Sequence, residues 1–394
     1  MPTDQPTDQP TDQPGQTTGQ RYDVVVALNY YAPYVSGVTE AARVTAEGLA
    51  ARGRRVLVVC GRHDPTTPRR ERIAGVDVIR TPVVARIGKG IVSPSFVPTV
   101  VRHARRAAAL HLHLPMLEAG AITAAVPRRL PVLATYQCDV VLPPGGLNRV
   151  QTWALDRSHG VALRRADAVG VTSEDYARSS RLARAMAGRT HELPAPAVDR
   201  SGGEPTFRDG PGLHVGFLGR IVEEKGLEYL VRGFRALPDE DARLLIGGDF
   251  AKVAGGSVVD RVRAAIDGDP RVRLLGFLPE ESLPDFYASL DVFTLPSVNS
   301  LEAYGLVQVE ALMLGLPVVA SDLPGVRQPV RRIGLGRVVP PRDADAITQA
   351  LREIAVLPAE RDDAARLARE SFGAPRVVAD HADLLDSLVA RARR

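Results

Sequence analysis

The chain of 394 residues is too long for one ordinary domain and suits two of about 180 residues each. Its hydrophobic fraction of 45% allows sizeable cores, but no apolar run approaches the ~20 residues that span a bilayer. The first residues are not basic and then apolar, so we expect no signal peptide. The two cysteines, Cys60 and Cys138, fit no metal-binding spacing, so the composition favours a reduced, cytoplasmic setting.

The net charge of +4 is unevenly distributed along the chain. Residues 21–195 carry 25 Lys and Arg against 13 Asp and Glu, whereas residues 196–394 carry 25 against 30. A basic first half favours an anionic partner or peripheral contact with an acidic membrane face. An arginine-rich coding bias is the alternative explanation, because only three of the fifty cations are lysines. Nothing in the sequence indicates a nucleic-acid partner.

The N-terminal part begins with a polar repeat and continues as a Rossmann-like unit. Residues 1–20 repeat Pro-Thr-Asp-Gln three times and have no apolar face, which predicts a disordered tail. A buried strand at 23–28 leads into a loop with Ser36-Gly37, a helix that ends at Arg52, and a second strand. No G-x-G-x-x-G follows the first strand, which disfavours a dinucleotide cofactor.

The rest of 21–199 continues as one domain of alternating strands and helices. We expect strands at 76–80, 111–115, 131–135 and 168–172, an irregular segment at 82–98, and helices at 100–110, 150–165 and 173–187. His111 and His113 alternate on one side of their strand. Such a pair could bind a metal, but a structural role or a place on the substrate side is favoured.

Residues 200–212 are rich in Gly, Pro and charge, which predicts a linker to a second domain at 213–374. Its first strand, 214–218, is followed by Gly219-Arg220 and Lys225-Gly226, then by a helix at 227–235. Open α/β sheets bind ligands at the carboxyl ends of their strands. Arg220 and Lys225 therefore suit a diphosphate, although alone such a pair is often solvated surface.

Further elements of the second domain follow the same alternation. We expect strands at 242–247, 272–276 and 291–295, and helices at 258–266, 283–289, 345–357 and 375–392. The Asp-x-Asp at Asp343 and Asp345 lies in a polar loop and is interpreted as a helix cap rather than a metal site.

The stretch 296–319, PSVNSLEAYGLVQVEALMLGLPVV, carries the densest chemistry. We expect a loop capped by Ser300, a helix at 306–314 and a strand at 317–320. Glu302 and Glu310 flank a helix start whose free N–H groups face any anion placed there. The stretch suits a nucleoside diphosphate sugar, whose phosphates would lie at the helix start and whose hydroxyls would donate to the two carboxylates. Taken alone, two solvated glutamates on a capped surface helix would give the same pattern.

These residues resemble the C-terminal signature of the retaining glycosyltransferases of family 4. Its Pro-Ser, its E-x-F/Y-G-L and its E-A-hydrophobic-x-x-G-x-P-V-V are all present between Pro296 and Val319, and the resemblance covers most of 22–390. It implies the GT-B fold, an α/β architecture in which two Rossmann-like domains face a central cleft. It also implies that the last helix, 375–394, crosses back to the first domain.

The resemblance implies roles for individual residues. The catalytic candidates are Arg220, Lys225 and Glu302. The candidates for binding the donor are Gly37, Gln137, Gly219, Phe277, Leu278, Tyr304, Gly305, Leu306 and Glu310. The candidates on the acceptor side are His111, His113 and Asp139. Gln137 departs from the family pattern, which often has histidine there, and so bears on the identity of the sugar.

The sequence thus predicts a retaining, metal-independent hexosyltransferase without a cofactor. It would use a nucleoside diphosphate sugar, UDP- or GDP-linked, and an acceptor hydroxyl compound that is anionic, lipid-linked or a small metabolite. The first domain would form the acceptor side and the second would bind the nucleotide sugar. Two alternatives stay open: a nucleotide-sugar epimerase or sugar-phosphate synthase on the same fold, and a non-catalytic subunit that binds sugar nucleotides.

Overall fold

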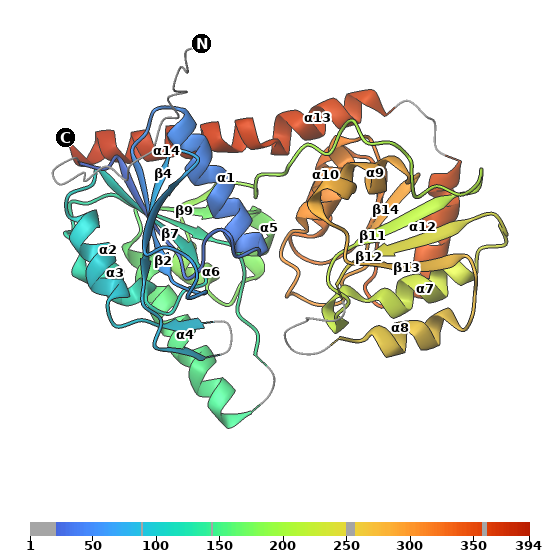
Figure 1. Cartoon of the computed structure of the whole chain (residues 1–394), viewed down its shortest axis with the longest axis horizontal. Coiled ribbons are helices and arrows are strands. Elements are labelled where there is room, and N and C mark those ends of the chain that lie inside the picture. Colours follow the sequence, from blue (N-terminus) through green and yellow to red (C-terminus); the bar gives the residue numbers. More distant parts are fainter. Residues whose placement is uncertain (1–20, 88–89, 143–144, 250–256, 357–360) are drawn as a thin grey trace, which may run out of the picture.

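The computed structural model describes residues 21–87, 90–142, 145–249, 257–356 and 361–394, so the predicted N-terminal tail lies outside the described residues. Two mainly parallel sheets, each with helices on both faces, form two separate domains side by side (Figure 1). The first sheet comes from residues 24–192 and the second from residues 214–339. No helix among the described residues combines the length and the apolar character that crossing a bilayer requires.

The first sheet has eight strands, of which only β3 runs antiparallel to its neighbour. In sheet order they are β10 (Thr190–Glu192), β9 (Ala168–Val171), β8 (Val132–Tyr136), β7 (Ala109–Leu114), β1 (Val24–Ala27), β2 (Val56–Gly61), β4 (Val76–Thr81) and β3 (Arg70–Ile73). Its central strands are buried at every position and mostly apolar, because alternate side chains enter two different cores. Val25 joins the core on one face and Val24 the core on the other.

In the described part of the first domain, six helices lie on these faces. They are α1 (Gly37–Ala51), α2 (Phe96–Ala104), α3 (Ala119–Ala125), α4 (Gly146–Arg165), α5 (Glu174–Ser179) and α6 (Ala183–Met186). Helix α1 begins within the expected loop, after Ser36, whose hydroxyl accepts from the Thr39 N–H at 3.2 Å. It ends one residue before the predicted end, ahead of Gly53 at φ 80°.

The second sheet has six parallel strands. In sheet order they are β13 (Val272–Gly276), β12 (Arg243–Gly247), β11 (His214–Leu218), β14 (Val292–Leu295), β15 (Val318–Ser321) and β16 (Gly336–Val339). The helices of this domain are α7 (Leu227–Arg235), α8 (Val259–Ile266), α9 (Leu283–Ala288), α10 (Leu306–Met313), α11 (Arg327–Ile333), α12 (Ala344–Ala355) and α13 (Asp362–Phe372). Asp343 caps α12 by accepting from the Ala346 N–H at 2.9 Å, as predicted.

The last helix, α14 (Ala374–Ala392), crosses back to the first domain and packs along α1 (Figure 1). Ala382, Leu385 and Leu388 enter the core that lies under β1 and β2. A Cβ added at Gly48 of α1 would lie 2.6 Å from Val378, so glycine there lets the two helices approach closely. The predicted return of the C-terminal helix is confirmed.

Several local predictions differ from the structure. The helix expected at 100–110 is α2, which begins at Phe96 because Pro98 is tolerated in a first helical turn. Part of 82–98 forms a short hairpin of β5 (Ala85–Ile87) and β6 (Gly90–Val92). The helix expected at 173–187 is two helices, because Ser180 is extended and its hydroxyl donates to Asp139 instead.

The two domains touch through a bidentate ion pair as well as through the chain. Arg327 of α11 donates from Nε and Nη2 to the two carboxylate oxygens of Asp175 on α5, each at 2.8 Å, and the Gly325 N–H adds a bond of 3.1 Å. Arg327 holds the pKa of Asp175 well below its usual range. The chain crosses between domains twice, before Ala197 and at Gly373, and these two residues form a parallel β-bridge.

Residues 200–212, predicted as a linker, lie against the second domain. Arg208 pairs with Asp291 at 3.0 Å. Two glycines make the close approach possible, because a Cβ at Gly203 would lie 2.1 Å from the backbone of Pro284, and one at Gly212 would lie 2.1 Å from that of Asp241. The segment therefore connects the domains as a packed strap.

Candidate active site

The carboxyl ends of β11, β12 and β13 are joined by backbone hydrogen bonds. The Gly219 N–H donates to the Gly247 carbonyl at 3.0 Å, and the Gly248 N–H donates to the Gly276 carbonyl at 2.7 Å. A Cβ at Gly248 would lie 1.8 Å from the Gly219 oxygen, so only glycine fits. These contacts place the loops after the three strands next to one another at one edge of the sheet.

Lys225 and Glu302 form an ion pair at this edge. They follow β11 and β14, which are neighbours in the sheet. The loop after β14 is held against the turn before α7, because the Val298 N–H donates to the Glu224 carbonyl at 2.9 Å and Gly226 lies against the Pro296 carbonyl. Both side chains are mostly buried, with 14% and 13% exposed. The structure thus joins two of the predicted catalytic residues.

Arg220, the third catalytic candidate, lies one residue beyond Gly219. Its side chain is 47% exposed and pairs with Glu224 at 3.3 Å. Phe277 and Leu278 lie in the loop after β13, the strand on the far side of β12 from β11. The Phe277 side chain is 73% exposed, whereas Leu278 packs against Gly247. This edge of the second domain therefore presents a solvent-accessible cation and an exposed aromatic ring on either side of the glycine contacts.

Helix α10 begins at this edge without a capping side chain. Its N-cap is Gly305 at φ 81°, where a Cβ would lie 2.2 Å from Leu295 Cδ2, and the predicted cap Ser300 is therefore wrong. Ser300 lies in a turn five residues before the cap. The N–H groups at Leu306 and Val307 thus begin the helix uncapped, which is the arrangement that binds phosphates.

Glu310 lies one turn further along α10, in a buried cluster. It is 6% exposed, and it accepts from Arg200 Nη2 at 3.2 Å and from the Tyr287 hydroxyl at 2.9 Å. Burial raises its pKa, and Arg200 opposes that rise. Each oxygen of the carboxylate keeps room for a further donor. Arg200 is 110 residues away in the sequence and stood out in no motif, so sequence reasoning missed it.

On the first domain, Gly37 opens α1 and Gln137 follows β8. A Cβ at Gly37 would meet nothing within 4 Å, so the start of α1 is open to a ligand. Gln137 is 8% exposed, and its Nε2 lies 3.4 Å from Nδ1 of His113. Neither residue has a recorded contact with Lys225, Glu302 or Glu310 among the described residues.

The three residues predicted for the acceptor side lie in the interior instead. His111 and His113 are 0% and 2% exposed, because α14 covers their strand, and their rings lie 4.2 Å apart with His381 beside them. Burial lowers the pKa of His113 to about 3, so it stays neutral. Asp139 is 8% exposed and accepts from the hydroxyls of Tyr136 and Ser180. All three side chains are thus packed among other residues, and their assignment to the acceptor side stays a prediction.

The edge of the second sheet can therefore hold an anion between two cations and a helix start, with a carboxylate beside it. Among the described residues there is no group of three or more His, Cys, Asp or Glu arranged to hold a metal ion.

Two sequence families match the chain, one on each domain. Residues 36–196 match the glycosyl transferase 4-like domain, and residues 212–355 match the glycosyl transferases group 1. A curated relative, the 2-deoxystreptamine N-acetyl-D-glucosaminyltransferase of Streptomyces fradiae, is 31% identical over 248 residues. That match covers 58% of this chain and spans only about half of the relative, 55% of its length.

Solved structures show the same fold over nearly the whole chain. The sucrose-phosphate synthase from Thermosynechococcus elongatus has a TM-score of 0.73 at 23% identity and covers 94% of this chain and 100% of its own. An Anabaena protein, HepE, in complex with UDP-glucose has a TM-score of 0.68 at 18% identity and covers 93% and 100%. These similarities confirm the predicted GT-B fold.

Breaking the Arg200–Glu310 pair should cost stability in a pH-dependent way. With Arg200→Met, the buried Glu310 loses its cationic partner, and we expect the free energy of unfolding to fall by ~3–5 kcal/mol at pH 8. Burial raises the pKa of Glu310, so the folded variant binds more protons than the unfolded chain, and its stability falls as pH rises through that raised pKa. Urea unfolding at pH 5 and pH 8 measures both effects.

Arg208→Met is the matched control, because Arg208 lies in the same strap and pairs with Asp291 while 29% exposed. It should cost at most ~1 kcal/mol with little pH dependence. Equal losses in the two variants, or no difference between the two pH values for Arg200→Met, would contradict the buried pairing.

Proposed function

Because the chain belongs to the group 1 glycosyltransferases, we propose that it transfers a hexosyl group from a nucleoside diphosphate sugar to an acceptor hydroxyl. The donor is UDP- or GDP-linked, and the anomeric configuration is retained. The observation that carries the proposal is the contact of Lys225 with Glu302 beside the uncapped start of α10. An anion-binding helix start, a buried lysine and a carboxylate for hydroxyls are the three features that a nucleotide sugar requires.

The donor diphosphate binds at the start of α10, where it competes with Glu302 for Lys225. Released from the ion pair, Glu302 accepts hydrogen bonds from the sugar hydroxyls. Glu310 accepts from the ribose diol, since its bonds to Arg200 and Tyr287 leave lone pairs free. Gly219 lets the backbone approach the diphosphate, and Tyr304 and Leu306 offer backbone N–H groups on either side of Gly305.

The reaction breaks the bond between the anomeric carbon and the diphosphate oxygen, so negative charge grows on that oxygen. Lys225, Arg220 and the helix start stabilise this charge in place, and no metal ion is required. In this proposal Gln137 shapes the sugar side, but an amide cannot accept a proton from the acceptor. The departing diphosphate therefore takes the proton of the attacking hydroxyl. Gly37 at the start of α1 completes the site when the cleft closes.

Removing Lys225 should reduce turnover without unfolding the protein. We expect Lys225→Ala to lower kcat/KM at least tenfold, about 1.4 kcal/mol or more of transition-state stabilisation. Slow hydrolysis of a panel of nucleotide sugars, followed by mass spectrometry, identifies the donor on which to measure it. NMR of the first-formed product then reads the anomeric configuration.

Arg232→Ala, a change at an exposed cation of α7, is the control for net charge and should leave kcat/KM unchanged. Near-normal turnover in Lys225→Ala would remove Lys225 from the reaction. A product with inverted configuration would overturn the retaining mechanism while leaving the transfer itself intact.

Metal independence has its own test. The two cations that neutralise the diphosphate belong to the protein, so we expect EDTA to leave the rate of transfer unchanged at saturating donor. The measurement compares rates with EDTA, with EDTA plus excess Mg²⁺, and without either. Loss of activity that Mg²⁺ restores would show that a metal does the work assigned to Arg220 and Lys225.

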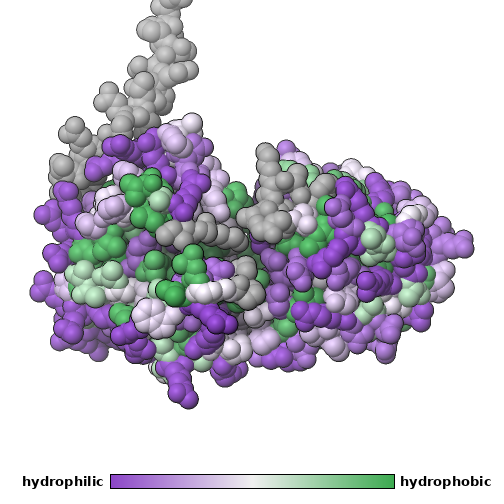
Figure 2. Space-filling model, turned by 90° about the horizontal axis from the view of Figure 1, so that it is seen from below, coloured by the Kyte–Doolittle hydropathy of each residue, from purple (hydrophilic) through white to green (hydrophobic). Residues whose placement is uncertain are grey.

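The acceptor side also includes a surface that suits an anionic membrane. The first half of α4 projects from the first domain (Figure 1), and Leu147, Val150 and Trp153, spaced three residues apart on it, are 72%, 61% and 68% exposed. Figure 2 views the molecule from that side and shows apolar patches among hydrophilic residues of the first domain. Arg149 and Arg157 are exposed on the same helix. Apolar residues with flanking arginines are typical of peripheral membrane contacts.

We expect the protein to co-sediment with vesicles that contain phosphatidylglycerol, less so at high salt, and weakly with pure phosphatidylcholine. Replacing both Leu147 and Trp153 by serine should reduce the bound fraction severalfold, since both side chains would leave the interface. Val84→Ser, at another exposed valine of this domain, is the control. Equal binding of the wild type and the double variant would contradict this contact.

A further inference from the structure

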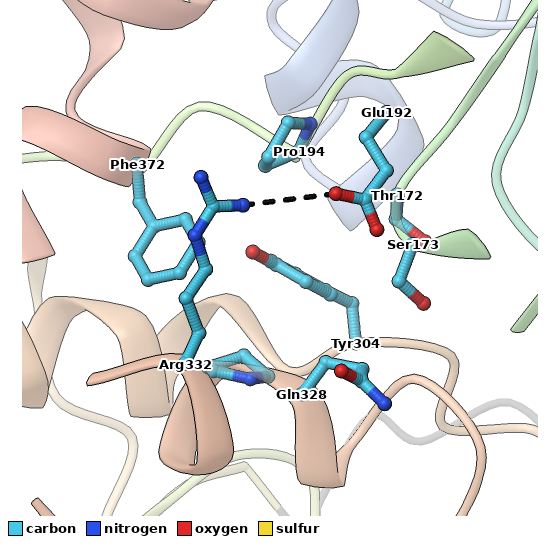
Figure 3. A pocket seen from close by; sticks show the side chains of 9 residues that line it. Thr172, Ser173, Glu192, Pro194, Tyr304, Gln328, Arg332 and Phe372 are labelled. Atoms are coloured by element: carbon cyan, nitrogen blue, oxygen red, sulfur yellow. Dashed lines mark ion pairs between the residues drawn. The ribbon is translucent and has the colours of Figure 1, made fainter. Parts of the chain in front are cut away.

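A cavity lies between the domains, where the chain crosses from one to the other. It has a volume of about 180 Å³ and is lined by Pro194 near the first crossing and Phe372 at the second (Figure 3). We call it the hinge cavity. At roughly 30 Å³ for each water molecule, it would hold about six waters or one molecule of monosaccharide size. The residues assigned to the diphosphate, Arg220 and Lys225, do not line it.

Two buried hydroxyls in the hinge cavity have no partner. The hydroxyl of Tyr304 and Oγ1 of Thr172 make no hydrogen bond with any described residue, although the two residues are only 5% and 6% exposed. Leaving such a group unpaired costs about 1–3 kcal/mol. Figure 3 shows the Tyr304 ring extending into the cavity from below, with its hydroxyl toward Arg332 and Pro194. Two unpaired hydroxyls that line one cavity indicate that an occupant supplies their partners.

The charged residues of the hinge cavity come from both domains and balance each other. Arg332 of α11 lies 3.7 Å from Glu192 of β10, and their side chains are 50% and 42% exposed. The guanidinium of Arg332 also lies over the Phe372 ring, 5.4 Å from its centre. A small anion would be attracted by Arg332 and repelled by Glu192. A small cation would be attracted by Glu192 and repelled by Arg332. A neutral diol can accept from Arg332 and donate to Glu192 at once.

We propose that the hinge cavity binds a small neutral polyol of monosaccharide size, at a site that adjoins the donor site at Tyr304 but includes none of the residues assigned to the diphosphate. Its hydroxyls pair with Thr172 and Tyr304 inside and with Arg332 and Glu192 at the mouth, and Phe372 supplies an apolar face. The proposal does not depend on the transfer reaction, because it concerns binding alone.

The test is saturation-transfer NMR of the whole protein with glucose, myo-inositol and glycerol as probes. We expect glucose or myo-inositol to bind more tightly than glycerol, since they reach more of the lining. Thr172→Val removes one hydroxyl at constant volume, and Arg332→Gln removes the charge at the mouth. Each should weaken binding about tenfold, as expected for the loss of one good hydrogen bond.

Two controls separate this site from its surroundings. Arg331→Gln changes the neighbouring cation on α11, which is 51% exposed and also ion-paired, and should leave binding unchanged. Glu302→Gln alters the donor site and should also leave it unchanged. Loss of binding in Glu302→Gln, with full binding in Thr172→Val, would place the polyol in the donor site and overturn the proposal. Absence of binding by all three probes would show that the cavity holds water only, and would overturn it too.

Folding is checked on the same variants. Because the Thr172 hydroxyl has no partner, Thr172→Val should not lower the thermal midpoint. A midpoint that falls by several degrees would show that the hydroxyl already has a partner, which contradicts the observation on which the site rests.

Discussion

The candidate site depends on the contact between Lys225 and Glu302, which joins the loops after two neighbouring strands. Gly226 lies against the Pro296 carbonyl, and the pairing of β11 with β14 brings the two loops to the same edge of the sheet. Each charge is mostly buried, so each needs the other while no ligand is present. In the proposed function, a diphosphate that binds the lysine would leave the carboxylate without its partner unless the ligand also offered hydroxyls. The ion pair would then couple recognition of the phosphates to recognition of the sugar.

Much of the second domain could be predicted because its signals are local. Strand β11 and helix α7 begin and end at the predicted residues, and α10 ends one residue before the predicted end. The helix start next to Glu302 follows from Gly305 and an apolar run, which short-range rules describe well. Ser300 failed as a cap because the loop before α10 needs a left-handed residue next to Leu295, and this depends on packing rather than on propensity.

The contacts that escaped prediction join residues far apart in the sequence. Arg200 contacts Glu310, Asp175 contacts Arg327, and His381 lies beside His111. Neither Arg200 nor His381 belongs to a recognisable motif. Nor does a strand pattern reveal that a helix from the other end of the chain will cover it. This is why His111 and His113 were expected on the substrate side and lie in the interior. The periodicity of a strand therefore does not predict that a segment distant in the sequence will bury it.

The β-bridge between Ala197 and Gly373 joins the two chain segments that connect the domains. Two chain segments joined by a backbone hydrogen bond restrict rotation of one domain against the other more than a single connection would. The two domains should therefore open and close by bending at this double connection, in one direction. A protease that nicks one of the two passages would leave the halves tethered by the other.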